Sequence, residues 1–190
     1  DGTVHQLQGE KICIGAGART FIPDLPGLDD VGYITSETLF GNAYPQQPYR
    51  SLLIIGGGPI GCEFAHVFSA AGTRVTLIQH NVRLLPKEDE EISAFLLQQF
   101  QNAGITVHLN QDTLSVRSEN GEKILTCQDR KTGQTLTVQA EEILVAPGIH
   151  PMTDLLHLEH TDIQTDRQGY ILTNEFLETS AEGIWALGDI

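Results

Sequence analysis

The sequence predicts an α/β fold, in which a parallel sheet carries helices on both faces and a three-stranded antiparallel β-meander is added. The continuous apolar run 52–55 indicates a strand that is covered on both faces. Glycines follow it, and apolar residues then recur at helical spacing up to Ala71, with Gly72 suited to the C-cap. The meander is predicted by short alternating segments at 113–118, 123–129 and 135–139, which Asn120-Gly121 and Thr132-Gly133 separate.

The remaining elements follow from the same two periodicities. The expected strands lie at 11–15, 74–79, 105–109 and 142–146, and the expected helices lie at 35–41 and 89–103. The last of these helices begins with acidic residues, which suit the positive end of the helix dipole. Its inner stripe is predicted to consist of Ile92, Phe95, Leu96 and Phe100.

Composition excludes several classes of protein. A formal net charge of −14 over 190 residues disfavours a nucleic-acid partner or an anionic membrane surface. No apolar stretch is long enough to span a bilayer and no basic, apolar leader opens the chain, so a cytoplasmic location is expected. The three cysteines, Cys13, Cys62 and Cys127, are far apart and the histidines show no metal-ligand spacing. We therefore expect reduced thiols and no metal site.

The ends of the chain suggest a piece of a larger protein. The first residue is Asp1 rather than methionine, and the chain stops at Gly188-Asp189-Ile190 without a terminal helix. We expect that other segments of the same protein adjoin it.

The glycine-rich turn carries the main functional prediction. Gly56, Gly57, Gly58, Pro59, Ile60 and Gly61 fit the pattern GxGxxG between a buried strand and a helix. In a Rossmann-like unit the first glycine allows a sharp turn, the second lets a pyrophosphate approach and the third lets the helix pack on the strand. A ligand-free turn and a methyltransferase-type loop are the alternatives, whereas a P-loop is excluded because no GK[ST] follows.

The residue that ends the second strand should read the adenosine ribose of a dinucleotide. That residue is Gln79, which can bond a hydroxyl group and has no charge to repel a phosphate. His80 and Arg83 lie close by and could approach a 2′-phosphate. The sequence slightly favours NADP(H) and leaves NAD(H) open.

The run IIGGGPIGCEFAHVFSAAGTRVTLIQ resembles the nucleotide-binding domain of the class I pyridine nucleotide–disulfide oxidoreductases, which include dihydrolipoamide dehydrogenase, mercuric reductase and glutathione reductase. The flanks GAGARTFIPDLPGLDDVGYITSETLF and TSAEGIWALGDI are similar to that family as well. The resemblance implies an NAD(P)-binding domain at 49–145, with 1–48 and 146–190 as parts of an FAD-binding domain. It also implies that hydride passes from a nicotinamide to FAD and then to a disulfide or similar acceptor.

Further site residues are carried over from the resemblance. Glu63 matches a glutamate near the nicotinamide–flavin contact, and Asp189, with Gly188 beside it, matches an aspartate that bonds the ribityl chain of FAD. Gly148 lies in a turn that joins the two nucleotide domains and is counted with the cofactor-binding residues. That turn departs from the family pattern, because Ile149 and Met152 replace the usual arginine and asparagine.

No catalytic residue is expected in this chain, because the family's CxxxxC pair and its histidine–glutamate pair are absent from it. The implied partners are the FAD and dimerisation domains of a larger, homodimeric protein. Two alternatives remain open: a non-catalytic NAD(P)-binding redox-sensing module, and a flavin reductase or oxidase without the cysteine pair.

Overall fold

A computed structural model describes residues 4–41 and 44–190, which form two compact units. The larger unit comprises 20–148, and the smaller one comprises the N-terminal segment up to Arg19 together with 149–190. The larger unit begins at Thr20, and the bounds 49–145 of a nucleotide-binding domain stay a prediction. The segment around Ile34 belongs to this unit through two backbone hydrogen bonds. The Ile34 N–H donates to the Ile143 carbonyl at 2.9 Å, and the Ile34 carbonyl accepts from the Val145 N–H at 2.8 Å.

A four-stranded parallel sheet forms the centre of the larger unit. Its strands, in spatial order, are β5 (Thr106–His108), β4 (Arg74–Ile78), β3 (Ser51–Ile55) and β9 (Glu142–Val145). The central strand β3 is buried along its whole length, as the apolar run predicted. Every strand ends at the same edge of the sheet, so the loops that follow β3 and β4 are neighbours.

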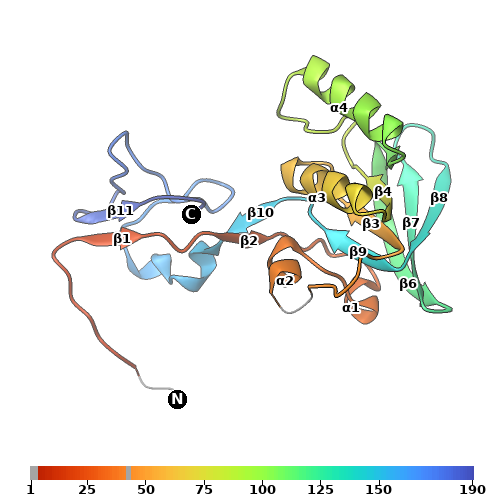
Figure 1. Ribbon diagram of the computed structural model, residues 1–190. Helices are drawn as coiled ribbons and strands as arrows, with labels where there is room; N and C mark the ends of the chain where they lie inside the picture. Colours follow the sequence, from red (N-terminus) through yellow and green to blue (C-terminus); the bar gives the residue numbers. More distant parts are fainter. Residues whose placement is uncertain (1–3, 42–43) are drawn as a thin grey trace. The chain divides into compact units, whose positions relative to one another are not determined.

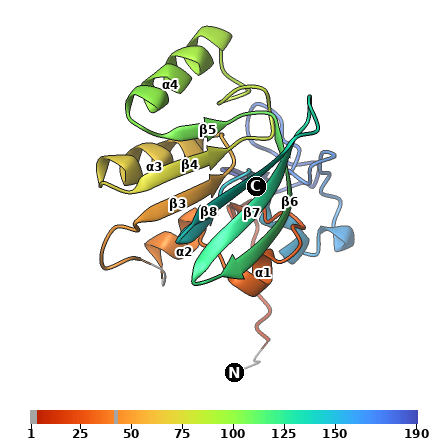
Figure 2. The same ribbon diagram turned by 90° about the vertical axis from the view of Figure 1, so that its right-hand side faces the viewer.

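The two faces of the sheet are covered by different elements (Figures 1 and 2). Helices α3 (Pro59–Ala70) and α4 (Glu90–Asn102) lie on one face, where Leu52 and Ile54 point into their core. The meander lies on the other face, where Leu53 and Ile55 point. This alternation is the two-residue period of a strand, and it explains why β3 is apolar at every position.

The meander consists of β6 (Gln111–Glu119), β7 (Glu122–Asp129) and β8 (Thr135–Ala140). Asn120 and Gly121 both have positive φ, at 53° and 81°, as a tight two-residue hairpin turn requires. The predicted fold class, a Rossmann-like parallel sheet plus a three-stranded meander, is confirmed, but the second face, where helices were also expected, packs mainly against the meander. The meander covers most of the second face, with the short helix α1 (Leu28–Val31) beside β6.

The predicted inner stripe of α4 is wrong at two of its four positions. Ile92 and Phe95 have exposed fractions of 53% and 62%, whereas Phe100 is buried and Leu96 packs against the core. The stripe that faces the sheet runs through Ser93 instead, whose hydroxyl donates to the Leu85 carbonyl at 3.4 Å. A small polar residue with a backbone partner therefore takes an inward position that apolar spacing alone did not reveal.

The smaller unit contains short strands around a small core. Strand β1 (Ile12–Ile14) pairs in parallel with β11 (Ile184–Ala186), and β2 (Ala18–Thr20) pairs with β10 (Ile149–Pro151). Two 3-10 turns, Met152–Leu155 and Leu158–His160, lie in the same region of the chain. The core residues are Ile163, Ile171, Ala186 and Ile190.

Two further predictions concern short elements and membranes. The helix expected at 35–41 is α2 (Ser36–Phe40), which Thr35 caps by accepting from the Thr38 backbone N–H at 3.2 Å. Within 4–41 and 44–190, no helix has the length and apolar character to cross a membrane.

Candidate dinucleotide-binding site

The turn between β3 and α3 is built around close backbone contacts. Gly56 has a φ of 114°, and a Cβ atom there would lie 2.3 Å from the carbonyl oxygen of Ala146. At Gly61, a Cβ atom would lie 2.0 Å from the carbonyl oxygen of Gly56. Both glycines are therefore required by the fold itself, because α3 and β9 approach the turn too closely for a side chain.

Gly57 is held in place by the loop that follows β4. Its N–H donates to Oε1 of Gln79 at 3.2 Å, and its carbonyl oxygen accepts from the Leu85 N–H at 2.8 Å. The Cys62 thiol donates to the same carbonyl oxygen at 3.6 Å. A Cβ atom at Gly57 would lie 2.7 Å from the side chain of Leu84. The shape of the glycine loop therefore depends on residues more than twenty positions away in the chain.

Gly58 differs from the other three glycines. Its φ of −78° and ψ of −175° are open to any residue, and a Cβ atom there would meet nothing within 4 Å. No contact within the described part of the chain therefore requires a glycine at this position. The space in front of its backbone is open to a ligand.

The start of α3 adds hydrogen-bond donors beside this open space. The first helical hydrogen bond runs from the Cys62 N–H to the Gly58 carbonyl at 3.0 Å. The N–H groups of Gly58, Ile60 and Gly61 precede it and have no acceptor within the helix. Pro59 occupies the first helical position, where a missing N–H has no cost. Free donors and the positive end of the helix dipole make this turn suitable for an anion such as a pyrophosphate.

Gln79 lies at the end of β4, where the sequence placed it, and its exposed fraction is only 4%. Besides accepting from Gly57, its side chain donates through Nε2 to the Arg83 carbonyl at 3.1 Å. Gln79 therefore joins the two loops at the carboxyl edge of the sheet, a role that the sequence did not predict. Its contact with a ribose stays a prediction.

The two candidate cations near Gln79 have protein partners. Arg83 pairs through Nη1 with Glu90 at 2.8 Å and donates through Nη2 to the Pro86 carbonyl at 3.0 Å. His80 is exposed and contacts Asp112 through Nδ1 at 2.9 Å. Arg83 is thus directed to the start of α4, whereas His80 faces the meander.

Of the other predicted site residues, Glu63 lies two residues after Gly61, whereas Gly148, Gly188 and Asp189 lie far from the glycine loop along the chain. Glu63 is exposed on α3. Gly148 follows β9, and its carbonyl oxygen accepts from the Phe21 N–H at 2.9 Å. Gly188 and Asp189 are exposed and belong to the smaller unit.

The buried cysteines are poor nucleophiles. Burial, with Glu63 as a second cause, raises the pKa of the Cys62 thiol to about 12, and burial raises the pKa of Cys127 to about 12. A thiolate is the reactive form, so both thiols are inert near neutral pH. No group of three or more histidine, cysteine, aspartate or glutamate side chains could hold a metal ion in residues 4–41 and 44–190.

Sequence reasoning missed the residues that shape the loops from a distance. Leu84 and Leu85 hold Gly57, and Asp112 and Arg130 of the meander meet at 3.4 Å beside His80. Leu84 carries a usable signal, since it is an apolar residue within a polar loop. The contacts of Asp112 and Arg130 depend on the register in which β6 and β7 pair, and no local sequence pattern predicts that register.

The sheet order, the covering meander and the glycine turn define an α/β protein with a Rossmann-like core. A family model described as "Pyridine nucleotide-disulphide oxidoreductase" matches residues 1–190. The chain therefore belongs to the pyridine nucleotide-disulphide oxidoreductase family, as its sequence resemblance indicated.

Individual relatives agree with this assignment. The chain is 36% identical to a mercuric reductase of Streptomyces lividans over 190 residues, and 36% identical to a dihydrolipoyl dehydrogenase of Chlorobaculum tepidum over 195 residues. Each match covers 100% of this chain and 39% of the relative. The solved flavoprotein disulfide reductase RclA from Escherichia coli superposes with a TM-score of 0.83 at 29% identity, over 96% of this chain and 40% of that one. The chain thus spans about two fifths of the length of these relatives.

Proposed function

We propose that this chain is the NAD(P)H-binding portion of an FAD-dependent oxidoreductase, which passes hydride from a nicotinamide to flavin and on to a disulfide or similar acceptor. Residues 49–145 form the nucleotide-binding domain in this proposal, and the flanking segments contribute to the flavin side. The relatives include a mercuric reductase, a dihydrolipoyl dehydrogenase and a flavoprotein disulfide reductase, and these names support a redox enzyme.

One observation carries the nucleotide-binding part of the proposal, namely the difference between Gly58 and the other glycines of the loop. Three of them are explained by contacts within the protein, whereas Gly58 has ordinary dihedral angles and open space in front of it. A glycine with no structural need, next to free N–H groups of a helix start, is what a bound pyrophosphate would require.

The flavin side of the proposal concerns Gly188 and Asp189. Asp189 is exposed, and a Cβ atom at Gly188 would meet nothing within 4 Å, so both residues fit a group that lies against this turn. They would hold FAD through its ribityl chain. FAD, when bound, accepts the hydride that the nicotinamide donates.

The two buried cysteines of the larger unit are unsuited to transferring electrons to an acceptor. Cys62 and Cys127 are buried and have raised pKa values, so neither serves as a redox-active thiol near neutral pH. We therefore place the contact with the acceptor in segments of the protein outside these 190 residues. On its own, the chain should bind nucleotide and should not reduce disulfides.

The experiment is a calorimetric titration of the protein with NADH and with NADPH, repeated on Gly58→Val. The added side chain occupies the pyrophosphate position, so the heat of binding should disappear for both nucleotides while the unfolding temperature stays unchanged. Ala71→Val, at the other end of α3 and exposed, enlarges a side chain without approaching the loop and should bind like the unmodified protein.

Two results would contradict the proposal. The first is the absence of heat with either nucleotide at about 1 mM, which corresponds to less than about 4 kcal/mol of binding free energy. The second is unchanged binding by Gly58→Val, because a ligand that tolerates valine there does not use the turn.

A further inference from the structure

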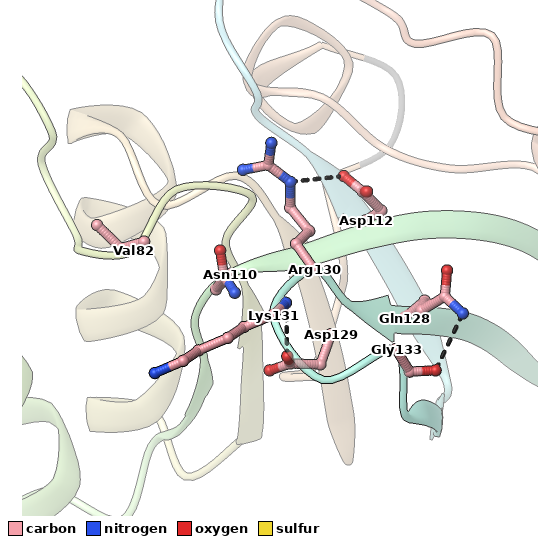
Figure 3. Close-up of a pocket in the computed structure, with 8 residues that line it drawn as sticks. All are labelled: Val82, Asn110, Asp112, Gln128, Asp129, Arg130, Lys131 and Gly133. Atoms are coloured by element: carbon pink, nitrogen blue, oxygen red, sulfur yellow. Dashed lines mark hydrogen bonds and ion pairs between the residues drawn. The ribbon is translucent and has the colours of Figure 1, made fainter.

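A polar cavity of about 620 Å³ opens beside the loop that follows β4 (Figure 3). Val82 from that loop lies on one side of the cavity, and Arg130 and Lys131 from the β7–β8 connection lie on the other. Asn110, from the loop between β5 and β6, lies between them, and Asp112, from the start of β6, lies beyond Arg130 on the side away from Val82. The cavity is therefore next to the end of β4, where a residue that binds the adenosine ribose is expected.

Backbone hydrogen bonds fix the cations of the meander beside this loop. The Asn110 N–H donates to the Asn81 carbonyl, and the Arg130 N–H donates to the Asn110 carbonyl, each at 2.9 Å. The loop after β4 is thus joined to Arg130 through a single intermediate residue. This arrangement holds the backbone of Arg130 beside the loop after β4.

The guanidinium of Arg130 is anchored at one end and open at the other. Its Nε contacts Oδ1 of Asp112 at 3.4 Å, and Nη1 makes a long contact of 3.5 Å with the His80 carbonyl. Nη2 has no partner within residues 4–41 and 44–190, and Figure 3 shows both terminal nitrogens pointing away from Asp112. Two donors on one edge of a guanidinium are what bidentate phosphate recognition uses.

The charges around the cavity favour an anion on the Arg130 side. Asp112 is the shared partner of Arg130 and of His80, which contacts it at 2.9 Å. Asp129 is engaged by its own turn, because its Oδ1 accepts from the backbone N–H groups of Lys131 and Thr132 at 2.9 and 2.7 Å. The ammonium of Lys131 makes no ion pair with the described residues, and Figure 3 shows it extended along the cavity toward the side of Val82.

The two residues that the sequence offered for this role, His80 and Arg83, both have protein partners, and His80 contacts Asp112 at 2.9 Å. Arg83 is engaged by Glu90 and the Pro86 carbonyl. Gln79 is neutral and buried, so no carboxylate at the end of β4 repels a phosphate. Recognition of a phosphate at this strand end therefore falls to the meander.

We propose that this cavity receives the 2′-phosphate of NADP(H), with Arg130 as its principal ligand and Lys131 as a second cation, so that the protein prefers NADP(H) over NAD(H). The inference rests on the proposed nucleotide-binding function, which it deepens by naming the nucleotide. Arg130 is a specificity-determining residue in this account, and Asp112 positions its guanidinium.

The experiment compares four probes by calorimetry on the protein and its variants. NADPH and NADH form one pair, and adenosine 2′,5′-bisphosphate and adenosine 5′-monophosphate form a second pair that differs only in the 2′-phosphate. Arg130→Ala should raise the Kd of both phosphorylated probes about tenfold, the loss expected for one charged hydrogen-bonding group. The Kd values of NADH and adenosine 5′-monophosphate should stay unchanged.

Arg117→Ala is the matched control, because Arg117 is an exposed arginine of the same meander that pairs with Glu119 at 3.4 Å. It removes the same charge and should leave all four Kd values unchanged. Lys131→Ala should produce a smaller loss for the two phosphorylated probes. Added salt should reduce the difference between NADPH and NADH, since the preference is electrostatic.

The outcomes separate the two proposals. If NADH and NADPH bind equally well and Arg130→Ala changes neither, the cavity does not read the 2′-phosphate, although the glycine loop still binds a dinucleotide. If Arg130→Ala weakens all four probes alike, Arg130 supports the loop and not the phosphate, and the inference is wrong. If no probe binds at all, the proposed function itself fails.

Discussion

The side-chain oxygen of Gln79 accepts a hydrogen bond from the backbone N–H of Gly57 at 3.2 Å. The same side chain donates to the Arg83 carbonyl at 3.1 Å, so one buried amide connects the loop after β3 with the loop after β4. The position that a Rossmann-like unit uses to read the ribose thus also determines the shape of the pyrophosphate turn. Changes at Gln79 should affect nucleotide binding as a whole.

Gln79→Met tests this coupling. Methionine is similar in length and cannot make either hydrogen bond, and it leaves the Gly57 N–H without its acceptor. We expect the free energy of unfolding to fall by about 2 kcal/mol. The affinities for NADH and NADPH should fall together, because both nucleotides share the turn. Urea unfolding and calorimetry measure the two effects.

The control for this variant is Gln99→Met, at an exposed position of α4, which should change neither quantity. A loss of NADPH affinity alone in Gln79→Met would mean that Gln79 acts at the 2′-position and not through the turn.

Gly58 and Gly61 should respond in opposite ways to the same substitution. In Gly61→Ala the new Cβ atom would lie 2.0 Å from the backbone oxygen of Gly56, so the free energy of unfolding should fall by about 3 kcal/mol. Gly58→Ala meets open space at ordinary dihedral angles. It should change the free energy of unfolding by less than about 1 kcal/mol, because the entropy that alanine removes from the unfolded chain offsets its lower preference for the N-cap of α3.

Urea unfolding of the two variants side by side provides the measurement. Equal destabilisation by both substitutions would show that the turn needs glycine at Gly58 for the fold. In that case the presence of glycine at position 58 would no longer support the proposal that a ligand binds there.

The part of the site that sequence reasoning found is local in the chain. The apolar strand β3, the glycine loop and the start of α3 are contiguous, and their glycines follow from the geometry of one turn. Even there, the requirement for glycine at position 56 depends on a distant segment, because a Cβ atom would clash with the carbonyl of Ala146, which directly follows β9. The GxGxxG pattern thus identified Gly56 correctly but did not predict its contact with Ala146.

The part that was missed depends on contacts between distant segments. Arg83 was a reasonable candidate for a phosphate, yet Glu90 lies seven residues further on and pairs with it. Arg130 reaches the same loop because β6 and β7 pair in a particular register, which places Asp112 opposite Gln128. The spacing of residues along the chain does not predict that register. The position of Arg130 beside the loop after β4 therefore became known only from the structure.

The three cysteines should differ sharply in reactivity. Cys13 is exposed, whereas Cys62 and Cys127 are buried and have pKa values raised to about 12. With a chromogenic thiol reagent near pH 8, one thiol per chain should react at once and the other two only after denaturation. Cys13→Ser should abolish the fast reaction. Prompt reaction of a second thiol in the folded Cys13→Ser variant would contradict the burial of Cys62 or Cys127.

The same two thiols predict loss of stability at alkaline pH. Their folded pKa values, about 12, lie above the ordinary value of 9.0, so the folded protein holds these protons more tightly than the unfolded chain does. Their contribution to stability is therefore complete below about pH 9 and declines as the pH rises toward 12. Urea midpoints between pH 8 and 10.5 should fall less in Cys62→Ala/Cys127→Ala than in the unmodified protein. An identical pH slope in both proteins would rule out these thiols as the cause.

Lys123 and Glu142 form a largely buried ion pair between the meander strand β7 and the sheet strand β9. Their side-chain exposed fractions are 15% and 18%. Lys123 also donates to the Gly32 carbonyl at 2.9 Å, and Glu142 accepts from the Ile143 N–H at 2.8 Å. Both charges are therefore satisfied in the folded protein, and removing one leaves the other buried without its partner.

Lys123→Met should lower the free energy of unfolding by about 3 kcal/mol, because Glu142 then remains as an uncompensated buried charge. The double variant Lys123→Met/Glu142→Leu should be more stable than the sum of the two single losses implies, since apolar side chains of similar volume often replace a buried pair at little cost. A double-mutant cycle in urea measures this coupling. Additive losses would mean that the two side chains act independently and that the pair does not hold the meander against β9.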